Sequence, residues 1–259
     1  MRAASVRRRG LISAMLNRRS IRYFSSAPVG EEVARLIIEA GQRAPCVYQS
    51  YSVIRLKDPQ VRRKVVEIIG DDPPLRAPLL LLVCLDVRRT SRMFSLMTER
   101  HVLRTERHPV ETVEMLVEMA MFMENMVIAA EALALGSVVL DYPLRAPEEF
   151  SRALDLPEKV IPLFLMCVGQ PAESPPLRPR MPLRFVYHVD RYRDPTEEEL
   201  QGYLTEADEA HNSEGYLRKY GNLDVKYREY MSQKVSQSKA QEEEASEVQR
   251  FFRASGLIL

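Results

Sequence analysis

Residues 111–135 are the segment that most constrains how this chain folds. Their sequence, ETVEMLVEMAMFMENMVIAAEALAL, combines strong helix formers with apolar side chains on nearly every face. A membrane span is excluded because charges at a bilayer centre are costly, and this segment holds Glu111, Glu114, Glu118, Glu124 and Glu131. A helix that is apolar on most faces is buried in a domain core or at a subunit interface. We therefore expect a long buried helix here, ended by Gly136.

Two continuous apolar runs, at residues 79–85 and 163–169, predict central strands that are buried on both faces. Residue type and spacing predict further strands at 51–56 and 138–140, strand or extended chain at 185–188, and helices at 30–43, 61–69 and 147–154. Strands therefore alternate with helices, which indicates an α/β or α+β fold with helices covering a sheet. Residues 88–109 are polar and basic without a clear period, and we predict a loop there, with a lid over a pocket as one interpretation.

The chain changes character at Thr196, which predicts two regions, residues 1–195 and 196–259. The second region is charged and helical, with an acidic run at 241–247 and apolar residues at its very end. A polar helical arm with an apolar end predicts packing on a partner subunit. A solvated terminus is the alternative interpretation.

Composition narrows the range of partners. The net charge of +1 gives no general attraction to nucleic acid or to an anionic membrane, so local clusters must carry any anion binding. Cys46, Cys84 and Cys167 stand singly among mostly apolar neighbours, which predicts buried, reduced thiols in a cytoplasmic protein. The four histidines lack metal-ligand spacing, and we predict no metal site.

The first 24 residues contain many arginines and no acid, which in composition resembles an organelle-targeting leader. This basic stretch continues directly into residues 20–24, SIRYF, which read as folded sequence. We therefore expect no cleaved leader.

Two arginine clusters stand far apart in the chain, at Arg18-Arg19-Ser20-Ile21-Arg22 and at Leu177-Arg178-Pro179-Arg180. A guanidinium group offers a planar fork of donors that fits phosphate oxygens two at a time. Each cluster alone is typical of a solvated surface patch, because arginine is mostly exposed. If the two clusters meet in the fold, they define a site for a phosphorylated small molecule.

The sequence lacks the common motifs of side-chain catalysis and nucleotide binding. It contains no P-loop, no GxGxxG and no GxSxG, and no pair of catalytic carboxylates stands out. Anion-binding features without a catalytic side-chain motif favour chemistry that is carried by a cofactor.

Several motifs occur in a fixed order, and the set resembles the nitroreductase family of FMN-dependent oxidoreductases. They are RRSIRYFSSAPV, RLIIEAGQRAP, YQSYSVIRLKD, APLLLLVCLD, NMVIAAEALALGS, LDLPEKVIPLFLMCVGQPAESPPLRPRMPL and VYHVDRY, and they span about residues 16 to 192. Their order and spacing are similar to the branch that contains the NADPH-dependent oxygen-insensitive nitroreductases and the flavin reductases.

The resemblance implies an α+β fold with a mostly antiparallel central sheet and an intertwined homodimer that holds FMN at its interface. Residues 1–195 would form the FMN-binding domain. The implied FMN-binding residues are Arg18, Arg19, Ser20, Arg22, Gln49, Arg178 and Arg180. Arg18, Arg178 and Arg180 would hold the phosphate, and Gln49 would contact the isoalloxazine or ribityl region.

No side chain is expected to react covalently. Arg22 would lie near the N1/O2 edge of the flavin, where a permanent cation stabilises the reduced ring. The implied activity is hydride transfer from NAD(P)H through flavin N5 to a nitro, quinone or flavin-like acceptor.

Two alternatives remain open at this point. The turn at 44–49 lacks an asparagine, residues 70–72 replace a Gly-Gly-Gln segment, and Asp141-Tyr142 replaces a glycine pair. These departures motivate a degenerate flavin- or nucleotide-binding protein without redox turnover. A nucleic-acid-binding module is disfavoured, because the chain has near-neutral charge and no recognition motif.

Overall fold

The computed structural model describes residues 2–97, 109–236, 239–255 and 257, and the chain forms two compact units. The first, here called the sheet unit, comprises Met1–Pro175 and Glu243–Leu259. The second, the helical unit, comprises Pro176–Glu242. Each unit is described separately.

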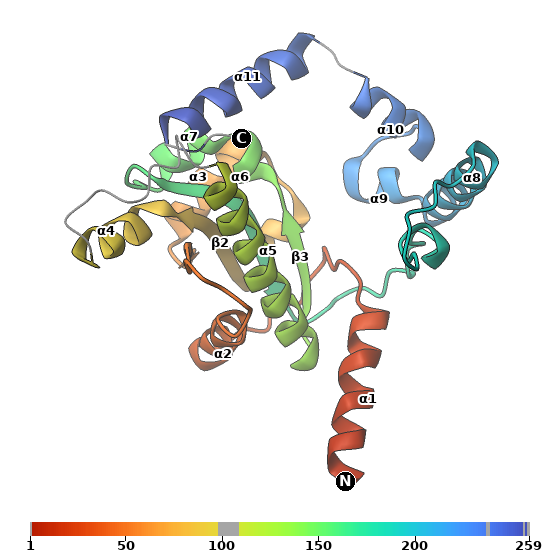
Figure 1. Ribbon diagram of the computed structural model, residues 1–259, viewed down its shortest axis with the longest axis horizontal. Helices are drawn as coiled ribbons and strands as arrows, with labels where there is room; N and C mark the ends of the chain where they lie inside the picture. The colour runs from red at the N-terminus through yellow and green to blue at the C-terminus, as the bar shows by residue number, and fades with distance from the viewer. Residues whose placement is uncertain (1, 98–108, 237–238, 256, 258–259) are drawn as a thin grey trace. The chain divides into compact units, whose positions relative to one another are not determined.

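The sheet unit is built on a four-stranded antiparallel sheet with the strand order β1-β2-β4-β3. The strands are β1 (Tyr51–Arg55), β2 (Leu79–Asp86), β3 (Gly136–Leu140) and β4 (Val160–Gly169). Both continuous apolar runs of the sequence lie in the central strands β2 and β4, as predicted (Figure 1). The mostly antiparallel sheet expected from the family resemblance is therefore confirmed.

Helices cover both faces of this sheet and create two cores. The residues of β2 alternate between them, with Leu79, Leu81, Val83 and Leu85 in the first core and Leu80, Leu82 and Cys84 in the second. This alternation follows from the two-residue period of a strand. In the first core, α2 (Glu31–Gly41) and α5 (Pro109–Ala132) pack on the sheet, and in the second α3 (Pro59–Ile69) and α7 (Pro147–Ala153) do so.

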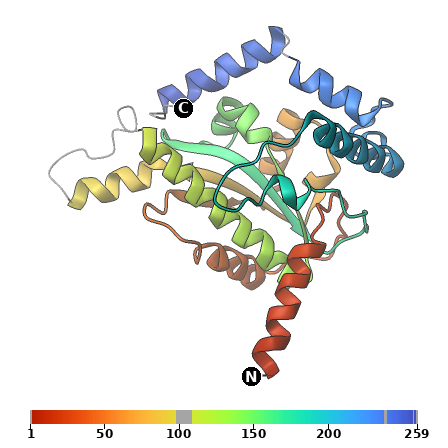
Figure 2. The ribbon, with the colours of Figure 1, turned by 45° about the vertical axis from the view of Figure 1, so that its right-hand side comes forward.

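Helix α5 is the long buried helix that the sequence predicts, and Figures 1 and 2 show it lying across the sheet. Met115, Phe122 and Met126 bury their side chains against β2 and β4. Gly41 lets α2 approach α5 closely, because a Cβ atom there would lie 2.7 Å from the Cγ of Met126. The helix ends at Ala132 rather than at Gly136, which is the first residue of β3.

Two other local predictions were wrong. Residues 87–97 form helix α4 (Val87–Met97) instead of a loop, because Val87 and Thr90 are buried on one face of it. Residues 98–108, on which the lid interpretation also depends, lie outside the described residues. Residues 185–188 are not a strand, since the chain there leaves a short 3-10 turn, Leu183–Phe185. Helix α1 (Arg2–Asn17) was not predicted from the sequence.

The helical unit contains α8 (Glu197–Glu214), α9 (Tyr216–Gly221) and α10 (Tyr227–Val235). Thr196 and Glu199 form a reciprocal capping box at the start of α8. The change in composition seen at Thr196 therefore coincides with the start of a helix. The first break between the two compact units follows Pro175, and the division into residues 1–195 and 196–259 remains a prediction.

The last residues of the chain return to the sheet unit. Helix α11 (Lys239–Ala254) leads to Phe252 and Leu257, which are buried in the first core of their own chain. The apolar end therefore has an intramolecular packing partner. Packing of residues 196–259 on a partner subunit remains a prediction. Within the described ranges, no helix is both long and apolar enough to cross a membrane.

Candidate functional site

The first arginine cluster lies along the edge of the sheet that β3 forms. Ser20 makes a parallel bridge with Ser137, and the backbone N–H of Ile21 donates to the Ser137 carbonyl at 3.0 Å. A Cβ atom on Gly136 would lie 2.6 Å from the Cγ1 of Ile21, so only glycine permits this approach. The close packing explains Gly136 better than the helix stop that the sequence suggested.

A carboxylate from the turn after β4 fixes the direction of this segment. The Oε1 atom of Glu173 accepts the backbone N–H groups of Arg22 at 2.7 Å and of Tyr23 at 3.2 Å. The N–H of Ala172 donates to the Tyr23 carbonyl in return. The backbone of Arg22 is therefore held by contacts that span about 150 residues of sequence.

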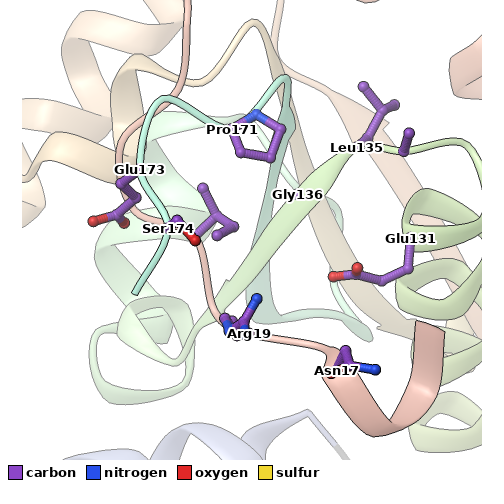
Figure 3. Close-up of a pocket in the computed structure, with 10 residues that line it drawn as sticks. Asn17, Arg19, Glu131, Leu135, Gly136, Pro171, Glu173 and Ser174 are labelled. Atoms are coloured by element: carbon purple, nitrogen blue, oxygen red, sulfur yellow. The ribbon is translucent and has the colours of Figure 1, made fainter. Parts of the chain in front are cut away.

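A pocket of about 260 Å³ opens beside this segment (Figure 3). It is lined by Asn17, Arg19, Ile21, Glu131, Ala134, Leu135, Gly136, Pro171, Glu173 and Ser174. The Nε atom of Arg19 and the Oγ atom of Ser137 are buried and have no hydrogen-bond partner among the described residues. A buried guanidinium donor without an acceptor suits an anionic ligand, because such groups are normally paired.

The electrostatics of the pocket combine both signs of charge. Burial raises the pKa of the Glu131 carboxyl, and the charges of Arg18 and Arg19 act in the opposite direction. Figure 3 shows Glu131 reaching from α5 toward the space that Arg19 borders. The two arginines therefore stand near one carboxyl that burial makes harder to ionise.

The turns at 70–72 and 141–142, which depart from the family pattern, meet on the same unit. The hydroxyl of Tyr142 donates to Oδ2 of Asp72 at 3.1 Å. Burial raises the pKa of Asp72, while this hydrogen bond and the charge of Arg22 lower it. Asp72 is thus an acidic neighbour of Arg22 that sequence inspection did not identify.

Gln49 lies at the opposite edge of the sheet, just before β1. Its backbone has φ 51°, in the left-handed region, and its side chain is exposed. Its N–H donates to Oε2 of Glu118 at 2.9 Å, and its carbonyl accepts from Nη2 of Arg89 at 2.8 Å. The turn is therefore held from both sides by groups remote in sequence.

One chain does not bring Gln49 to the arginine cluster. Strands β2 and β4 separate β1 from β3. Gln49 is anchored at Glu118, whereas Arg18 and Arg19 act on Glu131, thirteen residues later on α5 and about 20 Å along its axis. The two predicted contributions to the site are therefore well separated along α5, one near its middle and one near its C-terminal end.

The second arginine cluster belongs to the helical unit. The Nη2 atom of Arg178 lies 2.8 Å from Oε2 of Glu214, and its guanidinium carbon lies 3.8 Å from the ring centre of Tyr216. Arg180 is exposed. Because Arg18 and Arg180 belong to different units, their convergence on one phosphate remains a prediction.

The cysteines divide into two kinds. Cys84 and Cys167 are buried as predicted, and burial raises the pKa of both thiols, that of Cys84 to about 12. Cys46 is exposed, which corrects the prediction for that residue. It precedes the turn that Glu118 anchors, where the chain runs over the surface.

The residues that sequence analysis missed are Glu118, Glu173, Asp72, Tyr142 and Arg89. Each acts through a partner distant in the chain. For Glu118 the local sequence offered no distinguishing signal, because it is one of five glutamates in the run 111–135 and its burial is seen only in the fold.

The fold is that of an α+β protein, with a pocket beside β3 into which Arg19 brings a buried guanidinium donor. The chain belongs to the nitroreductase family, since the model described as Nitroreductase family matches residues 15–170. Among curated relatives, the FMN reductase [NAD(P)H] of Bacillus subtilis (strain 168) is 30% identical over 202 residues, covering 77% of this chain and 80% of the relative. The NADPH-flavin oxidoreductase of Vibrio harveyi is 28% identical over 199 residues, covering 74% and 78%.

Solved structures extend this similarity. B. megaterium NfrA1 superposes with a TM-score of 0.79 at 29% identity, covering 95% of this chain and 98% of that structure. The similarity therefore continues beyond residue 192, where the ordered sequence motifs end. The NADPH:FMN oxidoreductase from Vibrio harveyi complexed with NAD+ has a TM-score of 0.76 at 24% identity, and supports the fold.

Proposed function

We propose that this protein is an FMN-dependent oxidoreductase that transfers hydride from NAD(P)H to a nitro, quinone or flavin-like acceptor. The observation that carries the proposal is the pocket beside β3, where Arg19 presents a buried donor without an acceptor among the described residues. The relatives named as FMN reductase and NADPH-flavin oxidoreductase support it. Family membership alone does not select the acceptor.

The residues around the pocket fit the anionic tail of FMN. Arg18, Arg19 and Ser20 would hold the phosphate and ribityl oxygens through guanidinium and hydroxyl donors. Arg178 and Arg180 would complete the phosphate site. Arg178 already pairs with Glu214, which is largely buried, so Arg180 is the freer of the two to meet an added anion.

Bound FMN supplies the redox chemistry, by accepting a hydride from a nicotinamide and donating it to an acceptor. Arg22 would stabilise the negative charge of the reduced ring without changing its own protonation. Glu173 fixes the backbone of Arg22, so this cation keeps its place during turnover.

A homodimer is part of the proposal. Gln49 is anchored near the middle of α5 and the arginine cluster lies near its C-terminal end, so a second copy is needed to bring a Gln49 side chain to the pocket. Val47 in the Gln49 turn is exposed, and so are Val110, Val113 and Val117 on α5. An exposed apolar strip of this kind suits a subunit interface.

The location is proposed as the cytoplasm. Cys46, Cys84 and Cys167 are all free thiols, and free thiols are typical of a reducing compartment.

The direct test is a titration of the purified protein with FMN, followed by anaerobic addition of NADPH or NADH. We expect FMN to bind and its visible absorbance to bleach rapidly with at least one nucleotide. A protein that gains no flavin absorbance would contradict the proposal. Flavin binding without bleaching by either nucleotide would instead support the degenerate, non-catalytic alternative.

A further inference from the structure

Glu118 is a buried carboxylate in the middle of helix α5. Its residue is 4% exposed, and it faces the loop before β1. It accepts the backbone N–H groups of three consecutive residues, Val47, Tyr48 and Gln49, the last two at 3.0 Å and 2.9 Å. Burying a charge is costly unless hydrogen bonds compensate it, and three converging N–H groups provide that compensation.

Arg89 holds the same turn from the other side. Its Nη2 atom donates to the carbonyl of Gln49 at 2.8 Å and to that of Tyr51 at 2.6 Å. Asp86 orients it, with Oδ2 lying 3.6 Å from Nη1 of Arg89 and Oδ1 accepting the Arg89 backbone N–H at 2.8 Å. The N–H and the carbonyl of Gln49 are therefore both held by hydrogen bonds to side chains.

This double anchoring explains how the turn keeps an unfavourable conformation. Gln49 is not glycine, yet its φ is 51°, in a region that side chains with a Cβ atom rarely adopt. The turn at 44–49 lacks the asparagine that could stabilise it locally through its own side chain. A carboxylate and a guanidinium from distant elements supply the missing hydrogen bonds.

We propose that Glu118 and Arg89 are positioning residues for the reaction, holding the Gln49 turn in the geometry that presents its side chain to the flavin of the partner subunit's pocket. This inference rests on the proposed function, because Gln49 acts only on a bound flavin. Neither residue needs to touch the flavin. Each acts through the backbone of Gln49.

The test replaces Glu118 with Gln in the full-length protein. The glutamine amide has the same shape as the carboxylate but only one acceptor oxygen. Its NH2 group is a donor and cannot accept the backbone N–H groups that it would face. We expect kcat/KM with NADPH and a quinone acceptor to fall roughly tenfold to a hundredfold, as for other small displacements of a positioning group. The exposed Glu124 on the same helix gives a matched control, and Glu124→Gln should leave kcat/KM unchanged.

A merely structural role is separated by a double-variant cycle with Gln49→Ala. If Glu118 acts through Gln49, the double variant will be no slower than the slower single variant. Additive losses would overturn the inference. If Glu118→Gln fails to fold, Arg89→Gln repeats the cycle from the exposed side of the turn, and the same non-additivity is expected.

Amide hydrogen exchange keeps the two proposals distinguishable. In Glu118→Gln, exchange at residues 47–49 should accelerate, while amides in the middle of α5 stay protected. Accelerated exchange with unchanged turnover would overturn the positioning role and leave the proposed function intact. A wild-type protein that binds no FMN would instead defeat the proposed function, and the positioning role with it.

Discussion

The two edges of the sheet fix their exposed segments by different means. At the β3 edge, residues 20–24 join the sheet through backbone bridges, and residues 18–22 carry three arginines. At the β1 edge, the Gln49 turn carries no cation and is held in a left-handed conformation by Glu118 and Arg89. One edge supplies charge with ordinary backbone geometry, and the other supplies a special backbone geometry.

The difference teaches where each kind of function is encoded. The charged side chains at the β3 edge come from one short motif. Substitutions there should change the affinity for FMN and the rate of its reduction. Geometry at the β1 edge depends on groups from α4 and α5, so substitutions far from Gln49 should change its position. Both expectations would be wrong if substitutions at the two edges had the same effects on flavin binding and turnover.

The largest effect is expected from Arg22→Ala. Removing the fixed cation takes away the stabilisation of charge on the reduced flavin, and we expect reduction by NADPH to slow about a hundredfold. FMN affinity should fall much less, because Arg18 and Arg19 remain. Stopped-flow absorbance under anaerobic conditions measures the rate, and a fluorescence titration measures the affinity. Equal losses in both quantities would remove the special role of Arg22.

Gly136→Ala tests the backbone packing at the β3 edge. The added methyl group would lie 2.6 Å from Ile21, so the segment must shift, and we expect a loss of about 1–3 kcal/mol in the free energy of unfolding. Urea denaturation measures this loss. Gly202→Ala is the control, since nothing lies within 4 Å of that position in α8 and alanine favours a helix by about 0.5–1 kcal/mol. Unchanged stability of Gly136→Ala would show that the segment is not held tightly.

Arg180→Ala tests whether the helical unit contributes charge to the same site. Loss of one guanidinium from a phosphate should weaken FMN binding about tenfold, with little change in the reduction rate of the flavin that remains bound. Riboflavin lacks the phosphate, so its affinity should not change. A parallel loss for both flavins would place Arg180 outside the phosphate site.

Gln49→Gly compared with Gln49→Ala separates side chain from backbone at the β1 edge. Both variants lose the side chain, and turnover should fall equally. Glycine also relieves the left-handed strain, so Gln49→Gly should be more stable than Gln49→Ala by about 1 kcal/mol. Thermal unfolding measures the difference. Equal stabilities would mean that the turn stores no strain.

The smallest effect concerns Asp72, beside Arg22. Burial raises its pKa above the ordinary value of 3.8, so the folded protein binds this proton more tightly than the unfolded chain does. The stability that this proton contributes is present below pH 3.8 and is lost as pH rises through the raised folded-state pKa. Asp72→Asn should remove this dependence and leave the protein equally or slightly more stable at neutral pH, by a few tenths of a kcal/mol. Urea denaturation across this pH range, with Tyr142→Phe as a comparison, checks the sign. A variant that is less stable at neutral pH would contradict it.

Much of the fold follows from local patterns. The apolar runs of β2 and β4, the buried helix α5 and the periodic helices α2, α3 and α7 were predicted within a few residues. Each depends on a period of apolar residues that any packed core imposes. Helix α4 was missed because its buried face is formed by few residues, Val87 and Thr90 among them, in an otherwise polar segment.

The sequence by itself determined the family, and it holds the arginine cluster on which the proposed cofactor site depends, because both follow from motifs of neighbouring residues. Only the tertiary structure decided that Gly136 makes room for Ile21, that Glu118 and Arg89 hold Gln49, and that Tyr142 binds Asp72. The physical reason is that these hydrogen bonds and close contacts join residues 40 to 115 positions apart, and nothing in the local sequence identifies the two partners before the chain folds.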